Sequence, residues 1–164
     1  MLTSVSKKNI AANAALCVLL IAIACAVPAA SHLLNIPIYK ANPMLALLLI
    51  GIALSKDWRV GLALAVLMPV ASFLTTGMPD GGKAVCMVAE YAALTSVFFL
   101  TSQKLTHTLL SIFIATVAGK IVYYGMKLLI LSPATLIGTE WWIQLTSVVV
   151  LCCLFAIVYR KRVW

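Results

Sequence analysis

The sequence predicts an all-α fold, a polytopic membrane helix bundle of about six transmembrane helices in a single transmembrane domain over residues 1–164. Three observations support this prediction. Hydrophobic residues make up 64% of the chain and charged residues 10%, whereas a soluble domain is about one-half apolar and about one-quarter charged. The mean hydropathy is +1.12. The apolar residues also form runs close to the length of about 20 residues that a helix needs to cross a bilayer.

The first half of the chain contains three expected spans. The first covers residues 10–34, with Pro28 as a kink. A loop with two prolines leads to the second, over residues 43–54. This run is short for a span, so it either tilts, extends into the next two residues, or inserts only in part. The polar turn at residues 55–59 separates it from the third span, over residues 60–76.

The second half contains three more expected spans. The stretch at residues 77–83 is the richest in glycine and proline in the chain, so we expect a turn there. The fourth span then covers residues 84–101, and the fifth covers residues 108–131. Ser132-Pro133 opens the last loop, and the sixth span covers residues 141–159.

The N-terminal segment also fits a second interpretation. Lys7-Lys8, an apolar run and the small residues at positions 26–31 resemble a signal peptide, whose cleavage would remove the first span. The apolar run is longer than the usual signal-peptide core, which favours a membrane span.

Basic residues predict the orientation. Six spans place eight of them on one side: Lys7, Lys8, Lys56, Arg59, Lys104, Arg160, Lys161 and Arg162. Only Lys40 and Lys83 lie in loops on the other side. By the positive-inside rule both termini are cytoplasmic, and the chain is a multi-pass protein of the bacterial cytoplasmic (inner) membrane. The net charge of +8 therefore reflects topology, and we expect the lipid bilayer and no nucleic acid as a partner.

Several function classes lack their motifs. The sequence has no P-loop, no HExxH pattern and no Ser/His/Asp arrangement, so we expect no enzyme activity and no cofactor. The two histidines fall near opposite faces of the membrane. The cysteines lie in apolar runs without metal-ligand spacing, so we interpret them as small core residues and expect no metal: Cys17, Cys25, Cys86, Cys152 and Cys153.

Three charged residues fall inside the expected spans: Glu90, Lys120 and Lys127. A charge inside a bilayer costs about 2.5–3.5 kcal/mol on insertion scales, so it usually faces a cavity or a partner. On the fifth span, polar and aromatic residues recur at steps of three and four and share one helical face: Thr116, Lys120, Tyr123, Tyr124 and Lys127. The fourth span adds Tyr91 beside Glu90, and the sixth adds Trp142 and Gln144, all in the outer half.

Two interpretations of these residues stay open. The functional one is an outward-open pocket for a small polar molecule, with aromatic stacking and with Lys120, Lys127 or Glu90 pairing with substrate charges. The structural one is a Glu90–Lys120 ion pair, with Lys127 extending to the lipid headgroups.

The first span is rich in alanine. Its inner half contains Ala11, Ala12, Ala14 and Ala15, and further alanines continue at four-residue steps: Ala22, Ala26 and Ala30. Small residues allow another helix to approach closely, either within this chain or from a partner subunit.

Three segments resemble a known family. The sequence MPVASFLTTGMP at residues 68–79, followed by MVAEY at residues 87–91, is similar to the substrate-binding S components of energy-coupling factor (ECF) vitamin transporters. AGKIVYYG at residues 118–125 looks like the segment that follows in one branch of that family, where arginine is commoner at the position of Lys120. The resemblance extends over residues 10–131 in span order and spacing.

The resemblance implies a six-helix subunit that captures a vitamin or related micronutrient from outside. Such a subunit docks on an ECF transmembrane coupling subunit driven by two ATPase subunits. The family's Ala-x-x-x-Ala docking pattern matches Ala11 and Ala15 here, and Ala12 and the alanines from Ala22 to Ala30 are alternative matches. Its ligand site is built from helices four to six and two outer loops, where Asn42 and Met78 lie. The substrate stays open, and the alternative is a non-transport structural or scaffold protein of the cell envelope.

Overall fold

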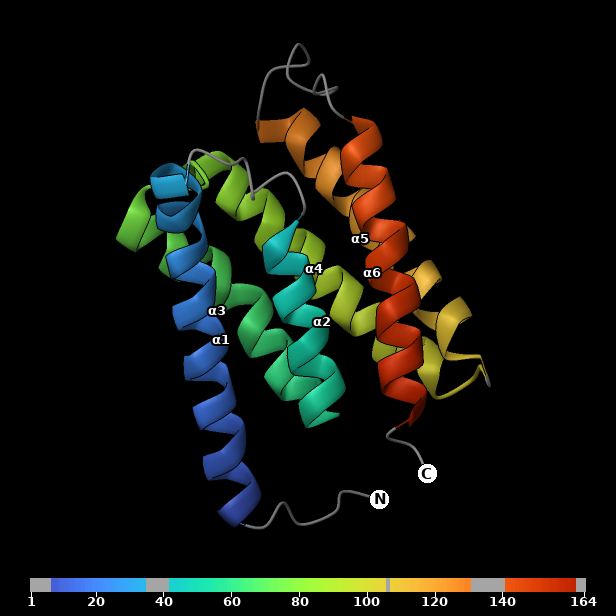
Figure 1. Ribbon diagram of the computed structural model, residues 1–164. Helices are drawn as coiled ribbons and strands as arrows, with labels where there is room; N and C mark the ends of the chain where they lie inside the picture. Colours follow the sequence, from blue (N-terminus) through green and yellow to red (C-terminus); the bar gives the residue numbers. More distant parts are fainter. Residues whose placement is uncertain (1–6, 35–41, 106, 131–140, 162–164) are drawn as a thin grey trace.

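The computed structural model describes residues 7–34, 42–105, 107–130 and 141–161, with the side chains of residues 7–9, 32, 141, 143, 144, 160 and 161 left out. This part of the chain folds into six helices, which confirms the predicted all-α bundle (Figure 1). Their bounds lie within one helical turn of the predicted ones. The helices are α1 (Lys7–Leu34), α2 (Pro43–Ser55), α3 (Trp58–Thr76), α4 (Gly81–Ser102), α5 (Thr108–Ile130) and α6 (Trp141–Lys161).

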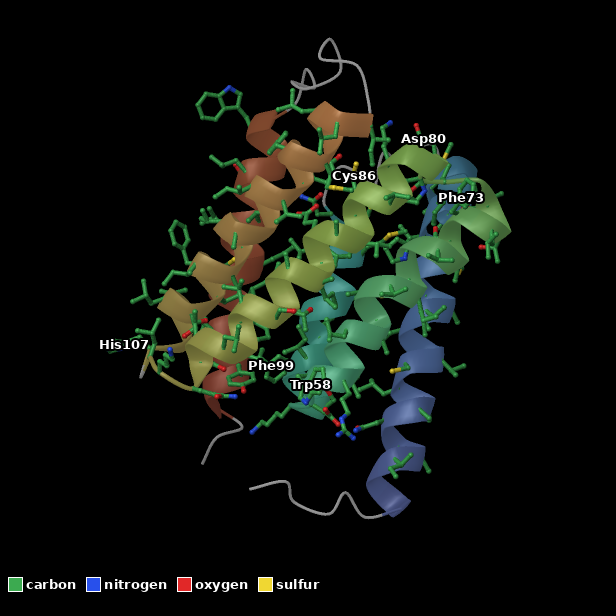
Figure 2. The ribbon with its side chains drawn as sticks, turned by 180° about the vertical axis from the view of Figure 1, so that it is seen from behind. Trp58, Phe73, Asp80, Cys86, Phe99 and His107 are labelled. Atoms are coloured by element: carbon green, nitrogen blue, oxygen red, sulfur yellow. The ribbon has the colours of Figure 1, made fainter. Side chains whose placement is uncertain are left out.

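The helices pack in a closed arrangement. α1 packs on α3 and α2, α3 on α4, α4 on α5, and α5 on α6, while α2 touches α6 and closes the bundle. The first turn of α1 and the last turn of α6 lie at the same end (Figure 1). We refer to this end as the inner end and to the opposite end as the outer end, after the orientation that the basic residues predict. Trp58 and His107 lie at the inner end, and Asp80 lies at the outer end (Figure 2).

The molecule is a membrane protein by the character of its helices. Within the described residues, α1, α3, α4 and α5 are long and apolar enough to cross a membrane. Their outward faces present large apolar side chains such as Leu74, Ile121 and Leu129. In water such a surface would drive aggregation, whereas lipid tails match it.

α2 is a buried helix at the centre of the bundle. It has 13 residues and is therefore about 20 Å long, against a hydrocarbon thickness of about 30 Å. Most of its side chains are buried against α1, α3 and α6. A helix that is apolar all round is stable where protein surrounds it. The short apolar run at residues 43–54 thus forms a complete helix that other helices cover.

The inner half of the core contains a group of aromatic side chains that joins α4 to α6. Phe98 is fully buried, and its ring packs edge-on against Phe155 at 5.1 Å between centroids and against Tyr159 at 5.4 Å. Edge-to-face pairs at this separation are favourable. The core therefore holds the inner ends of α4 and α6 together, whereas the buried charged residues Glu90 and Lys127 lie toward the outer end.

Candidate functional site

An ion pair between α4 and α5 lies at the centre of the candidate site. The Lys120 Nζ atom lies 2.6 Å from the Glu90 Oε1 atom, and the Glu90 side chain is 4% exposed against 27% for Lys120. Both residues lie near the middle of their helices, on the outer side. Charged groups at this depth are costly unless they are paired. The two side chains therefore stabilise each other, as the structural interpretation predicted.

A glycine brings α4 and α5 close together beside this pair. A Cβ atom added at Gly119 would lie 3.1 Å from the backbone oxygen of Glu90 and 3.2 Å from the Cβ atom of Leu94. Both separations are tighter than ordinary van der Waals contact. The position therefore favours a residue without a side chain, and the close approach places the next residue, Lys120, against Glu90.

Tyr123 lies between two lysine ammonium groups. Its ring centroid is 5.3 Å from the Nζ atom of Lys120 and 6.0 Å from the Nζ atom of Lys127, which is within the range of cation–π attraction. Tyr124 packs edge-on against Tyr123, at 5.4 Å between ring centroids, and is itself more exposed. Lys127 is only 8% exposed, so it is buried where the structural interpretation expected it to extend to the headgroups.

The same face of α4 adds a residue that sequence reasoning assigned to the core. Cys86 lies one turn from Glu90 toward the outer end, beside Asp80 (Figure 2). It is fully buried, and it lies near enough to Lys127, Asp80 and Glu90 for their charges to act on its thiol. The four-residue step from Glu90 is the signal that indicates this shared face. Tyr91, the neighbour of Glu90, is also buried.

The turn between α3 and α4 is held by hydrogen bonds. The Ser72 Oγ atom donates to the carbonyl oxygen of Met78 at 2.7 Å, and the Met78 N–H donates to the Thr76 Oγ1 atom at 3.2 Å. The Asp80 carboxylate accepts a hydrogen bond from the Lys83 N–H at 2.9 Å and caps α4. The Met78 side chain is exposed at this outer end of the bundle.

Asn42 connects the start of α2 to α6. Its Nδ2 atom donates a hydrogen bond to the Ser147 Oγ atom at 2.9 Å. The backbone of Asn42 has φ 51°, a left-handed conformation that asparagine tolerates better than most residues. The structure therefore assigns Asn42 a packing contact, and its part in ligand binding stays a prediction.

The remaining predicted residues of the site lie on α6. Trp142 is 62% exposed near the outer end of the helix, a position typical of interfacial indoles. The side chain of Gln144 lies outside the described residues. Nearer the middle, the Cys152 Sγ atom lies 3.4 Å from the Thr116 Oγ1 atom, which joins α6 to α5.

The alanines predicted to dock a partner are exposed. Ala11 and Ala15 lie on the outward face of α1, opposite the buried Ala24, and two further alanines continue this face toward the outer end: Ala22 and Ala26. The face is therefore not used for packing within the described part of the chain.

Two surface cavities lie apart from the charged residues. One, of about 410 Å³, lies between α3 and α4 and is lined by residues such as Phe73, Gly81 and Val85. The other, of about 440 Å³, lies between α5 and α6. Neither has Glu90, Lys120 or Lys127 in its lining. The outward-open pocket at these residues stays a prediction.

No protein-family model, no curated protein and no solved structure matches the chain. Within the described residues, no group of three or more histidine, cysteine, aspartate or glutamate side chains is arranged to hold a metal ion. Support for a function therefore comes from the geometry above and from the resemblance of the three sequence segments.

Proposed function

We propose that this protein is the substrate-capture S subunit of an ECF-type transporter in the bacterial cytoplasmic membrane. The observation that supports the proposal most strongly is the cluster of Glu90, Lys120, Tyr123 and Lys127 between α4 and α5. A protein that only spans the membrane has no need of three ionisable side chains on the inward faces of its helices, because each is costly to insert.

The proposed binding involves no chemistry. Lys120 and Lys127 attract a carboxylate or other anionic group, and Glu90 can accept an amine of a zwitterionic ligand. Tyr123 offers an aromatic face, and the buried Tyr91 follows Glu90 on α4. Residues 81–83 already belong to α4, so the turn before that helix is limited to residues 77–80. In this proposal that turn shifts over the ligand as a lid, since Gly77 has φ 69° and can accommodate backbone change.

The partners in this proposal are an ECF transmembrane coupling subunit and two ATPase subunits. The exposed alanine face of α1, with Ala11 and Ala15, supports docking of a partner helix because side chains of this size allow backbones to approach closely. The ligand site and this face lie on different helices, so they can be tested separately.

One observation favours the second candidate, a structural protein of the cell envelope. The Glu90–Lys120 pair is short and largely buried, as expected of a pair whose only role is to neutralise its own charges. Under this alternative no small molecule binds.

The test is to purify the protein in mild detergent and identify co-purifying small molecules by mass spectrometry. A vitamin-like compound at near-stoichiometric amount supports the proposal. The double variant E90Q/K120M, which removes both charges and keeps similar volumes, is the matched control and should lose the compound. A folded wild-type protein without any such compound, including after expression in vitamin-rich medium, contradicts the proposal.

A further inference from the structure

We propose that the groove between α5 and α6 binds the acyl chain of an anionic phospholipid of the inner leaflet, with Lys104 and His107 contacting its phosphate. The groove has a volume of about 440 Å³, and its lining is apolar at residues such as Phe113 and Val149 and carries His107 as a polar residue. This proposal is independent of the small molecule that the protein captures.

The groove has the position that a lipid of one leaflet requires. Its α5 wall is formed by the first two turns of that helix, and its lining begins at His107, which lies at the inner end (Figure 2). Its floor reaches the buried Cys152, whose sulfur lies against Thr116 of α5. The groove thus extends from the inner interface toward the middle of the bundle, along the direction of a lipid tail.

Apolar contact alone cannot select a lipid here, because lipid tails are as apolar as the groove. A preference for one lipid must therefore come from polar groups near the inner opening of the groove. His107 is an exposed residue of the groove lining, and Lys104, which precedes it in the connection between α4 and α5, is also exposed. Among the ion pairs formed by described residues neither is engaged. Basic residues beside a groove between transmembrane helices on the cytoplasmic side are suited to anionic headgroups.

The groove between α3 and α4 provides an internal comparison. Its volume is similar, about 410 Å³, and its lining is also apolar. It lies at the outer end, where the Lys83 ammonium is 4.0 Å from the carboxylate of Asp80. A cation with a neighbouring carboxylate attracts a phosphate less, so we expect no preference for anionic lipid there.

The experiment uses the full-length protein, delipidated in detergent. It is titrated with phosphatidylglycerol or with phosphatidylcholine of identical acyl chains, and bound lipid is counted by native mass spectrometry. Wild-type protein should bind phosphatidylglycerol at least about fivefold more tightly than phosphatidylcholine. The variant K104Q/H107Q should lose that preference. Glycerol phosphate, which has the headgroup charge without the tails, should not compete at matched concentration.

Two matched variants then test the groove itself. Val149 lines the α5–α6 groove and Val85 lines the α3–α4 groove, and each is 50% exposed. V149F fills the proposed site and should lower retention of phosphatidylglycerol at least about fivefold, whereas V85F should leave it unchanged. Equal binding of the two lipids by wild-type protein, effective competition by glycerol phosphate, or equal effects of V149F and V85F would each overturn the proposal.

Discussion

The ammonium of Lys120 lies 2.6 Å from a carboxylate oxygen of Glu90, and the carboxylate is the more deeply buried partner. Removal of one partner leaves the other as an uncompensated charge, and the penalty grows with the burial of the charge that is left. Substitution of Glu90 and substitution of Lys120 should therefore lower the stability of the protein by different amounts.

We expect K120M to destabilise the protein more than E90Q. K120M leaves a carboxylate that is 4% exposed, whereas E90Q leaves an ammonium that is 27% exposed. The expected losses are about 3 kcal/mol and about 1 kcal/mol, and the second is smaller because an unpaired lysine side chain can extend toward the headgroups. The double variant E90Q/K120M should be more stable than K120M. Thermal unfolding in detergent measures all three, and equal losses for the single variants would contradict the assignment.

Ligand binding is better tested at Lys127 than by charge reversal at Lys120. K120E would place two carboxylates against each other, so a loss of binding could reflect unfolding. K127Q removes the second cation beside Tyr123. It should lower the affinity for the co-purifying anionic ligand by about tenfold or more. Isothermal titration measures the affinity, with thermal unfolding alongside. Unchanged affinity in a folded K127Q protein would exclude Lys127 from the site.

Gly119 and Gly125 form a matched pair on α5. A Cβ atom at Gly119 would press on the backbone of Glu90 at 3.1 Å, whereas a Cβ atom at Gly125 meets nothing within 4 Å. G119A should therefore cost about 1–2 kcal/mol because α4 and α5 must separate. G125A should be neutral or stabilising by up to about 1 kcal/mol, because alanine favours the helix. Thermal unfolding of both variants tests this, and a similar change in both would mean that the close approach is not required.

Asn42 contributes to the stability of the fold through its backbone conformation and through its side-chain hydrogen bond. Two substitutions separate these effects. N42G keeps the left-handed conformation accessible and loses the hydrogen bond to Ser147, at a cost of about 1 kcal/mol. N42A also loses the bond and must adopt φ 51°, which adds about 1–2 kcal/mol. N42A should therefore unfold at the lower temperature. If N42A were as stable as N42G, the conformation of residue 42 would not be constrained.

The exposed alanine face of α1 predicts a position-specific effect on assembly. A15L enlarges a residue on that face, whereas A14L enlarges an exposed residue turned about 100° around the helix. Under the proposed function, A15L should reduce co-purification of the coupling subunit at least about tenfold, while A14L should retain it and both should keep ligand binding. Loss of assembly in both variants, or in neither, would argue that Ala15 is not at the interface.

The sequence was sufficient to predict the six helices and their order. Apolar runs and the glycine-rich turn predicted where α3 and α4 lie. The capping aspartates Asp57 and Asp80 were not predicted, and with them α3 begins at Trp58 and α4 at Gly81, before the predicted starts at residues 60 and 84. The presence of Glu90 in an apolar run also indicated an inward-facing carboxylate. Helix positions and the burial of a charge in a span depend on residues that are neighbours in the chain and on the bilayer. The local sequence is therefore sufficient to predict them.

The tertiary structure decided which of these groups meet. Sequence reasoning left open whether Glu90 pairs with Lys120, and it assigned Cys86 to the core alone. The 2.6 Å contact exists because α4 and α5 approach at Gly119, and α2 lies at the centre because three other helices cover it. Contacts of this kind depend on the shapes of helix faces that are distant in the chain. Hydropathy and turn chemistry describe each helix by itself, whereas packing selects the neighbour against which each face lies.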